Sequence, residues 1–245
     1  MAAAGAIVAA TIDHVGAHLE PGITTGELDR IAEDFIRAQG GVPTSKGYRG
    51  YPAAICISPN EVIVHGIPGR HVVAEGDVIT IDVGVTLEGF IADSAFTFGV
   101  GEVSNTARHL LNVGQKALDE GIASAQPGNR VGDISAAIQE VVERNDFSVV
   151  RSLVGHGVGR DYHEDPHIPN FGEPGRGPLL SEGMTIAIEP MITAGSAEIE
   201  ILDDDWTIRT EDGSLSCHFE HTVAITADGP RILTASADRE ASLLS

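Results

Sequence analysis

Basic residues, cysteines and long apolar runs are all scarce in this sequence of 245 residues. Asp and Glu number 36 against 15 Lys and Arg, so the formal net charge is −21. Such a negative field repels phosphate groups and argues against nucleic-acid or anionic-membrane partners. The only cysteines, Cys56 and Cys217, exclude a disulfide framework and are typical of a reducing, cytoplasmic setting.

No stretch of the chain reaches the ~18 uninterrupted apolar residues that a membrane helix requires. The apolar start of the chain lacks the positive segment of a secretory signal and changes to helical polar spacing. We therefore expect a first helix over 3–19, in a soluble protein with no membrane partner.

A repeated motif divides the chain into two parts. Residues 21–28 read PGITTGEL and residues 127–134 read PGNRVGDI, so both follow the pattern Pro-Gly-x-x-x-Gly-acid-aliphatic. Each copy separates two stretches with helical periodicity, which are 3–19 and 26–38, then 105–124 and 132–145. Segments of β-type sequence follow each pair: 53–65, 78–86 and 90–98, then 184–193, 197–210 and 216–226.

This order of elements predicts one α+β domain over residues 1–245. Its pseudo-repeat halves would span roughly 1–104 and 105–233, with a final strand segment after 227 and a polar tail at 234–245. Two duplicated αα-β halves would join their strands into a curved antiparallel sheet, with the helices on its outer face. A site on the pseudo-two-fold axis would receive residues from both halves.

Two aspartates interrupt the apolar stretch VITIDVGVTLEGFIADSAFTF at 78–98. Aspartate is depleted in strands and is rarely buried without a partner. A two-residue turn at Glu88-Gly89 would pair Asp82 with Ala95. Asp82 and Asp93 would then be diagonal neighbours on one face, about 7–8 Å apart at the backbone. A three-residue turn would instead place them on opposite faces.

Two glutamates have equally apolar surroundings, Glu189 in MTIAIEPMIT and Glu220 in CHFEHTVAIT, and neither segment contains Lys or Arg. Buried carboxylates without compensation would be costly or would stay protonated. Two divalent cations would balance four carboxylates, so the pattern predicts a dinuclear metal site. The alternative for each acid is a solvated position on an exposed sheet face.

Histidines supply candidate nitrogen ligands. His156 and His163 lie in GHGVGRDYHEDP, where three glycines argue against a helix and allow the backbone to pass close to the expected site. Neutral imidazole is a ligand for Zn, Fe, Co and Mn, and His65 in NEVIVHGIPG is a further candidate. A surface or hydrogen-bonded role is the alternative for each. The remaining histidines lack such context and are set aside: His14, His18, His71, His109, His167, His218 and His221.

Five segments of the chain resemble, in the same order, the motifs of type I methionine aminopeptidases. They are NEVIVHGIPG, ITIDVGV…FIADSAFTF, GHGVGRDYHEDP, TIAIEPMI and FEHTVAIT. The resemblance covers about residues 5–233. It implies the pita-bread fold and N-terminal methionine excision from peptides and nascent polypeptides when the second residue is small.

By this resemblance, two divalent ions (Co, Mn, Fe or Zn) are the cofactors. Asp82 would chelate one ion, and Asp93 and Glu220 would bridge both. His156 and Glu189 would complete the coordination of the second ion.

The resemblance also implies the catalytic and substrate-binding residues. His163 would hydrogen-bond the scissile carbonyl oxygen, His65 would contact the scissile amide nitrogen or the bound peptide, and Glu189 would shuttle protons. A slot for the methionine side chain would be lined by Tyr48, Tyr51, Cys56, Tyr162 and Trp206. Sulfur–aromatic contacts would favour Met modestly, whereas ordinary core packing is the alternative for these rings.

Some features depart from the family pattern. The family commonly has a Tyr-His-Gly-Asp type sequence where this chain has Phe90-Ile91-Ala92-Asp93. Because the aspartate is kept, this change puts the fine tuning of the site in doubt rather than the activity itself. We expect no N-terminal zinc domain for ribosome docking before the first helix. The acidic composition argues against strong attachment to the ribosome, so we expect only transient ribosome proximity. A monomer is the simplest expectation.

Rival interpretations stay open. An Xaa-Pro aminopeptidase or prolidase shares the fold and ligands, but usually has an additional N-terminal domain and Glu-Pro-Gly where this chain has Glu189-Pro190-Met191. A type II methionine aminopeptidase would need a helical insertion that this length does not accommodate. A non-catalytic pita-bread module that binds peptides would typically have lost ligands, and none is missing here.

Overall fold

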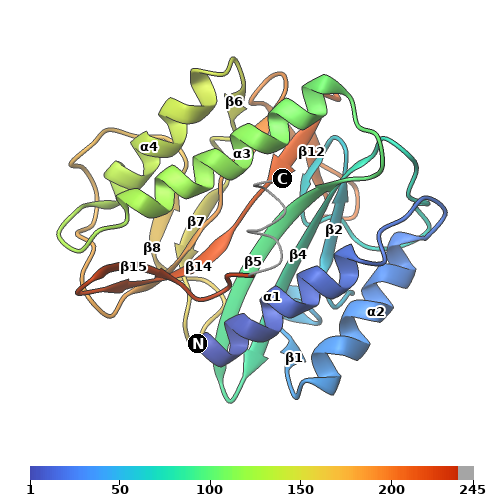
Figure 1. Ribbon diagram of the computed structural model, residues 1–245, viewed down its shortest axis with the longest axis horizontal. Helices are drawn as coiled ribbons and strands as arrows, with labels where there is room; N and C mark the ends of the chain where they lie inside the picture. The colour runs from blue at the N-terminus through green and yellow to red at the C-terminus, as the bar shows by residue number, and fades with distance from the viewer. Residues whose placement is uncertain (237–245) are drawn as a thin grey trace.

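The computed structural model describes residues 1–236, so most of the predicted tail at 234–245 lies outside the described residues. Its helices are arranged in two pairs, as Figure 1 shows: α1 (Ala2–Gly16) with α2 (Thr25–Ala38), and α3 (Asn105–Ser124) with α4 (Val131–Glu143). All four predicted helices are therefore confirmed, with ends that differ by a few residues. No helix in this part of the chain is both long and apolar enough to cross a membrane.

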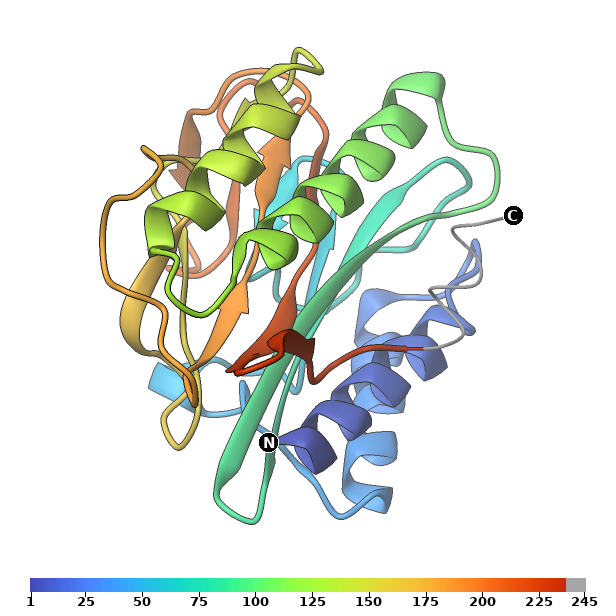
Figure 2. The ribbon, with the colours of Figure 1, turned by 60° about the vertical axis from the view of Figure 1, so that its left-hand side comes forward.

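The strands are all paired antiparallel in the described part of the chain. A four-stranded group contains β1 (Val42–Pro43), β2 (Cys56–Pro59), β4 (Val78–Leu87) and β5 (Phe90–Gly99). A five-stranded group contains β7 (Val154–Gly157), β8 (Glu164–Pro169), β9 (Thr185–Ile188), β14 (His221–Thr226) and β15 (Gly229–Ile232). Two three-stranded groups contain β6 (Ser148–Val149), β10 (Met191–Thr193) and β13 (Ser216–His218), and β3 (Val62–Val64), β11 (Ile199–Ile201) and β12 (Ile208–Thr210). In Figures 1 and 2 the helices cover one side of these strands, which confirms the predicted α+β arrangement.

The predicted strands at 184–193 and 216–226 are each interrupted. Glu189 and Pro190 separate β9 from β10, and Phe219 and Glu220 separate β13 from β14. Proline has no N–H to donate to a strand ladder, which explains the first break. Both predicted acids of the second half therefore lie between strands rather than inside them.

The two copies of the sequence repeat make matched contacts. Gly22 and Gly128 have φ values of 103° and 91°, a left-handed conformation that favours glycine. The N–H groups of Gly26 and Gly132 donate to the carbonyl oxygens of Gly69 and Arg176, both at 2.9 Å. These contacts support the internal repeat, and its origin by duplication stays a prediction.

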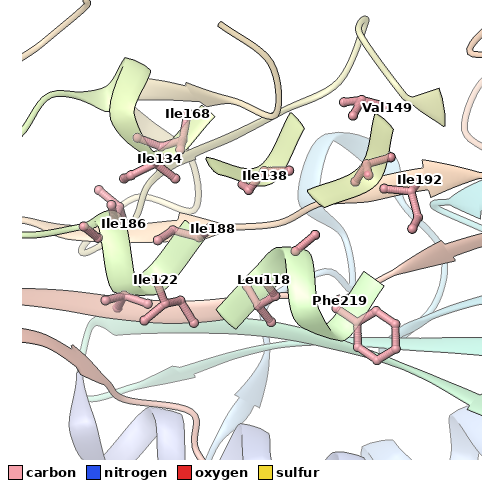
Figure 3. Packing of buried hydrophobic residues seen from close by; sticks show 14 of the residues in the cluster. Leu118, Ile122, Ile134, Ile138, Val149, Ile168, Ile186, Ile188, Ile192 and Phe219 are labelled. Carbon is pink, nitrogen blue, oxygen red and sulfur yellow. The ribbon is translucent and has the colours of Figure 1, made fainter. Parts of the chain in front are cut away.

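Apolar side chains attach each helix pair to its own strands. Figure 3 shows isoleucine and leucine side chains of α3 and α4 meeting those of the strands: Leu118, Ile122, Ile134, Ile138, Ile186 and Ile188. A second cluster joins α1 and α2 to Ile81 and Val83 of β4. Burial of each such side chain contributes about 1.5–3 kcal/mol. Since neighbouring residues of a strand face opposite sides, Asp82 points away from these helices.

Candidate metal centre and peptide-binding cavity

The β4–β5 hairpin holds the two predicted aspartates on one face. Glu88 and Gly89 have φ values of 51° and 76°, as a two-residue turn with two left-handed positions requires. The register pairs Asp82 with Ala95 and Gly84 with Asp93, so the aspartates are diagonal neighbours. The predicted turn and the shared face are both confirmed.

Hydrogen bonds between the halves bring Glu220 to Asp93. The Glu220 N–H donates to the carbonyl oxygen of Ala95 at 2.9 Å. The Thr222 hydroxyl accepts from the Asp93 N–H at 2.9 Å and donates to the Asp93 carbonyl oxygen at 2.7 Å. Side chains that are 127 positions apart in the sequence therefore share one buried location.

His156 lies on β7, which pairs with β9 next to Glu189. Its Nδ1 is 2.8 Å from the carbonyl oxygen of Gly157, and because a carbonyl only accepts, Nδ1 carries the proton. Nε2 therefore presents its lone pair, and it lies 3.5 Å from Oε1 of Glu189. In metal sites, a hydrogen bond from the other ring nitrogen to a carbonyl oxygen orients the imidazole that binds the ion.

The glycines around His156 lie where a Cβ atom would collide with neighbouring backbone. A Cβ on Gly155 would lie 2.4 Å from the carbonyl oxygen of Ala187, and one on Gly157 would lie 2.3 Å from that of Asp165. These glycines allow neighbouring strands to approach closely. The expectation that the backbone passes close to the site agrees with the position of Gly155, which lines the cavity and whose Cβ would lie 3.3 Å from Cγ of Glu189.

All five predicted metal ligands line one cavity of about 600 Å³: Asp82, Asp93, His156, Glu189 and Glu220. Ligand atoms of Asp93, His156 and Glu220 lie within 4.8 Å of one another. This cluster has the oxygen and nitrogen donors that divalent transition-metal ions accept.

The electrostatics of the cavity favour added positive charge. Burial, followed by repulsion from other carboxylates, raises the pKa of Asp82, Glu189 and Glu220. Burial also raises the pKa of Asp93 to about 7. Among the described residues that line the cavity, Arg49 is the only Lys or Arg. Oε1 of Glu220 is buried without a hydrogen-bond partner in the described part of the chain, so cations fit here.

The two other predicted histidines lie along the same cavity. His163 is on its exposed side, where a hydrogen bond of 2.9 Å joins its Nδ1 to the Tyr48 hydroxyl. The surrounding protein atoms, then the neighbouring His156, lower the pKa of His163 to about 4. Burial also lowers the pKa of His65, so both rings are neutral at pH 7.

The residues of the predicted methionine slot also line this cavity: Tyr48, Tyr51, Cys56, Tyr162 and Trp206. They form two clusters rather than one. In the first, Tyr51 and Trp206 meet edge to face at 5.1 Å and pack with Cys56. In the second, Tyr48 and Tyr162 meet edge to face at 5.1 Å.

Sequence reasoning missed several residues that line the cavity: Ser45, Arg49, His167 and His218. His218 is the clearest case, because its Nε2 lies 3.6 Å from Oε2 of Glu189 and 3.8 Å from Oε2 of Glu220. Burial, followed by repulsion from His65, lowers the pKa of His218 to about 3. The alternation of side chains along a strand could have identified it. His218 is two residues before Glu220, so in the predicted strand at 216–226 both side chains would be on the same face.

Comparisons with known proteins show the family of this chain. The model of metallopeptidase family M24 matches residues 1–227. The chain belongs to metallopeptidase family M24. This M24 chain is 52% identical to "Methionine aminopeptidase 1" of Bacillus subtilis over 234 residues, which cover 96% of it and 94% of that protein.

Solved structures are similar to the whole M24 domain. Methionine aminopeptidase from Rickettsia prowazekii matches it with a TM-score of 0.94 and 40% identity, over 96% of this chain and 95% of that one. Methionine aminopeptidase from Thermotoga maritima matches with a TM-score of 0.95 and 43% identity, over 96% of this chain and 95% of that one. The pita-bread fold expected from the sequence is thereby confirmed.

Prolidase from Pyrococcus furiosus is a more distant structural match. Its TM-score is 0.74 at 22% identity, and the match covers 96% of this M24 chain but 62% of the prolidase. At this identity the likeness concerns the fold alone.

Proposed function

We propose that this chain is a methionine aminopeptidase that removes N-terminal Met from peptides and nascent polypeptides when the second residue is small. The observation that carries the proposal is the convergence of the acids at 82, 93, 189 and 220 with His156 beside a slot lined by aromatic rings. The M24 membership and the near-full-length likeness to methionine aminopeptidases support it.

The cofactors in this proposal are two divalent ions, of Co, Mn, Fe or Zn. Asp93 and Glu220 would bridge them, Asp82 would hold one, and His156 with Glu189 would hold the other. Buried carboxylates whose pKa values are raised by mutual repulsion support this assignment. When bound, such ions acidify a water molecule and withdraw electron density from a peptide carbonyl.

The protein side chains would move protons and hold the peptide. The Tyr48 hydroxyl would donate to Nδ1 of His163, which leaves an Nε2–H to hydrogen-bond the scissile carbonyl oxygen. Glu189, with a raised pKa, would accept a proton from the attacking water and pass it to the leaving amine. His65, whose ring lies 6.0 Å from that of Trp206, would contact the amide nitrogen or the bound peptide.

The methionine side chain would occupy the space between the two aromatic clusters. Tyr51 and Trp206 would contact the thioether from one side, and Tyr48 and Tyr162 from the other. Cys56 would add a small apolar surface, because burial raises the pKa of its thiol and keeps it uncharged. Sulfur–aromatic contacts of about 0.3–1.5 kcal/mol would favour Met over aliphatic residues.

Turnover of a Met-Ala-Ser peptide, with metal titrated into chelated protein, tests the proposal. We expect Met release that rises with added metal and stops again with chelator, while an Xaa-Pro peptide stays intact. Cleavage of the Xaa-Pro peptide would favour the prolidase alternative. Peptide binding without turnover at every metal concentration would favour a non-catalytic module.

Partners and location belong to the same proposal. The substrates would be nascent chains, so the enzyme would work in the cytoplasm as a monomer in transient proximity to ribosomes. Cys56 and Cys217 are both free and buried, which supports a reducing compartment. The net charge of −21 opposes tight attachment to a polyanionic ribosome.

A further inference from the structure

His218 lines the cavity of the proposed metal centre, although the motif FEHTVAIT begins one residue after it and the proposed ligand set leaves it out. It is the last residue of β13 and is 2% exposed. Its Nε2 is 3.6 Å from Oε2 of Glu189, whose other oxygen, Oε1, is 3.5 Å from Nε2 of His156. The Glu189 carboxylate therefore has one imidazole beside each oxygen.

The backbone of His218 is held firmly. Its N–H donates to the Thr97 hydroxyl at 3.0 Å, and that hydroxyl donates to its carbonyl oxygen at 2.7 Å. β13 also pairs His218 with Met191, the first residue of β10 after Glu189 and Pro190. The ring thus has a fixed place beside both glutamates, which precede β10 and β14.

The ring nitrogens of His218 are buried and have no hydrogen-bond partner among residues 1–236. A neutral imidazole has one N–H and one lone pair, and leaving a buried polar atom unpaired costs about 1–3 kcal/mol. The polar atoms within 4.0 Å of Nε2 in ion-pair geometry are carboxylate oxygens of Glu189 and Glu220, at 3.6 and 3.8 Å. A small rotation of either carboxylate would bring it within hydrogen-bond distance.

We propose that His218 is a positioning residue whose Nε2–H donates to the Glu189 carboxylate and orients it for the metal ions. This inference rests on the proposed metal site. In this proposal His218 acts on the carboxylate rather than on an ion, because its Nε2 lies 3.6 Å from Oε2 of Glu189 and 3.8 Å from Oε2 of Glu220. Hydrogen bonds to metal-binding carboxylates raise metal affinity by holding the ligand in its bound orientation.

Metal affinity of suitable variants tests this role without relying on turnover. Mn²⁺ titration calorimetry of His218→Leu should show affinity weakened by about 10–100-fold. His218→Gln keeps an N–H donor and should stay within a few-fold of wild type. His109→Gln, an exposed histidine on α3, is the matched control and should bind as wild type does. Wild-type affinity in His218→Leu would overturn the proposal.

Two further measurements separate the possible failures. In the Zn²⁺-loaded wild-type protein, ¹⁵N NMR of the rings should find His218 as the Nε2–H tautomer, and a metal-bound Nε2 would overturn the positioning role. This spectrum needs no variant to fold. If the wild-type protein takes up no ion at all, the proposed function itself fails, whereas equal uptake by wild type and His218→Leu defeats only the present inference.

Discussion

The hydroxyl oxygen of Tyr162 lies 2.3 Å from the point that a Cβ atom on Gly84 would occupy. Gly84 faces Asp93 across the β4–β5 register, so the missing side chain leaves room for the ring beside that carboxylate. The Tyr162 hydroxyl donates to Oδ1 of Asp93 at 3.5 Å and is 3.1 Å from the Ser45 hydroxyl. One glycine on β4 therefore determines where a wall of the proposed methionine slot stands.

Gly84→Ala should displace Tyr162. Because the ring atom Cζ is also within 2.7 Å of the new methyl position, the whole ring must shift. We expect a stability loss of about 1–3 kcal/mol from overpacking and a kcat/KM for Met-Ala-Ser lowered by roughly 10–100-fold. Gly69→Ala, whose Cβ would have its nearest neighbour at 3.9 Å, is the control. Equal kinetics in both variants would contradict the assignment of Tyr162.

Asp93→Asn should separate stability from function. The substitution removes a buried carboxylate, so at pH 8 and with chelator present the free energy of unfolding should rise. With metal present, peptide turnover should fall to background, because the substitution removes a proposed metal ligand. Urea unfolding and peptide assays measure the two effects, with the exposed Asp34→Asn as control. A destabilised metal-free Asp93→Asn protein would argue that the carboxylate is structural.

The stability of the metal-free protein should depend on pH in the direction set by Asp93. Its pKa rises from 3.8 when unfolded to about 7 when folded, so the folded chain holds a proton that the unfolded chain releases. The contribution of Asp93 to the free energy of unfolding should be most favourable below pH 4 and should decline as the pH rises to 7. The total decline should be about 1.4 kcal/mol per unit of pKa shift. Unfolding midpoints at several pH values measure this slope, which Asp93→Asn should flatten. A slope that survives the substitution unchanged would assign it to other groups.

Tyr48→Phe should weaken catalysis while keeping the ring in the slot. The variant loses the hydrogen bond of 2.9 Å to Nδ1 of His163, so the imidazole is free to adopt the wrong tautomer or orientation. We expect kcat to fall about tenfold with little change in KM. His163→Ala, which removes the donor itself, should lower kcat by about 10²–10³-fold. An unchanged kcat in Tyr48→Phe would remove Tyr48 from the positioning of His163.

Trp206→Leu should reduce the preference for a thioether. The indole packs edge to face on Tyr51 in the first aromatic cluster, where the Met sulfur would contact it. The ratio of kcat/KM between Met-Ala-Ser and its norleucine analogue should fall by up to about tenfold. An unaltered ratio would show that the preference for sulfur arises elsewhere in the cavity.

Much of the site could be predicted from local sequence. The alternation of β4 and β5 and the Glu88-Gly89 turn are short-range features, and together they place Asp82 and Asp93 on one face. The four helices follow equally local signals, such as the capping box of Thr24 and Glu27 that begins α2. Pro190 is a local signal for the strand break at Glu189. The break at Glu220 could not be predicted, because it depends on long-range contacts such as that of the Glu220 N–H with Ala95.

The sequence by itself determined which donor atoms are available, since buried carboxylates and imidazoles in apolar segments need a positive partner wherever they meet. Only the tertiary structure decided their distances and added His218, because its side chain reaches Glu189 through the packing of β13 on β10. The tertiary structure also showed that Gly155 and Gly157 allow neighbouring strands to approach closely. The physical reason is range: periodicity and turn geometry act over a few residues, whereas a site shared by two halves depends on how distant backbones pack.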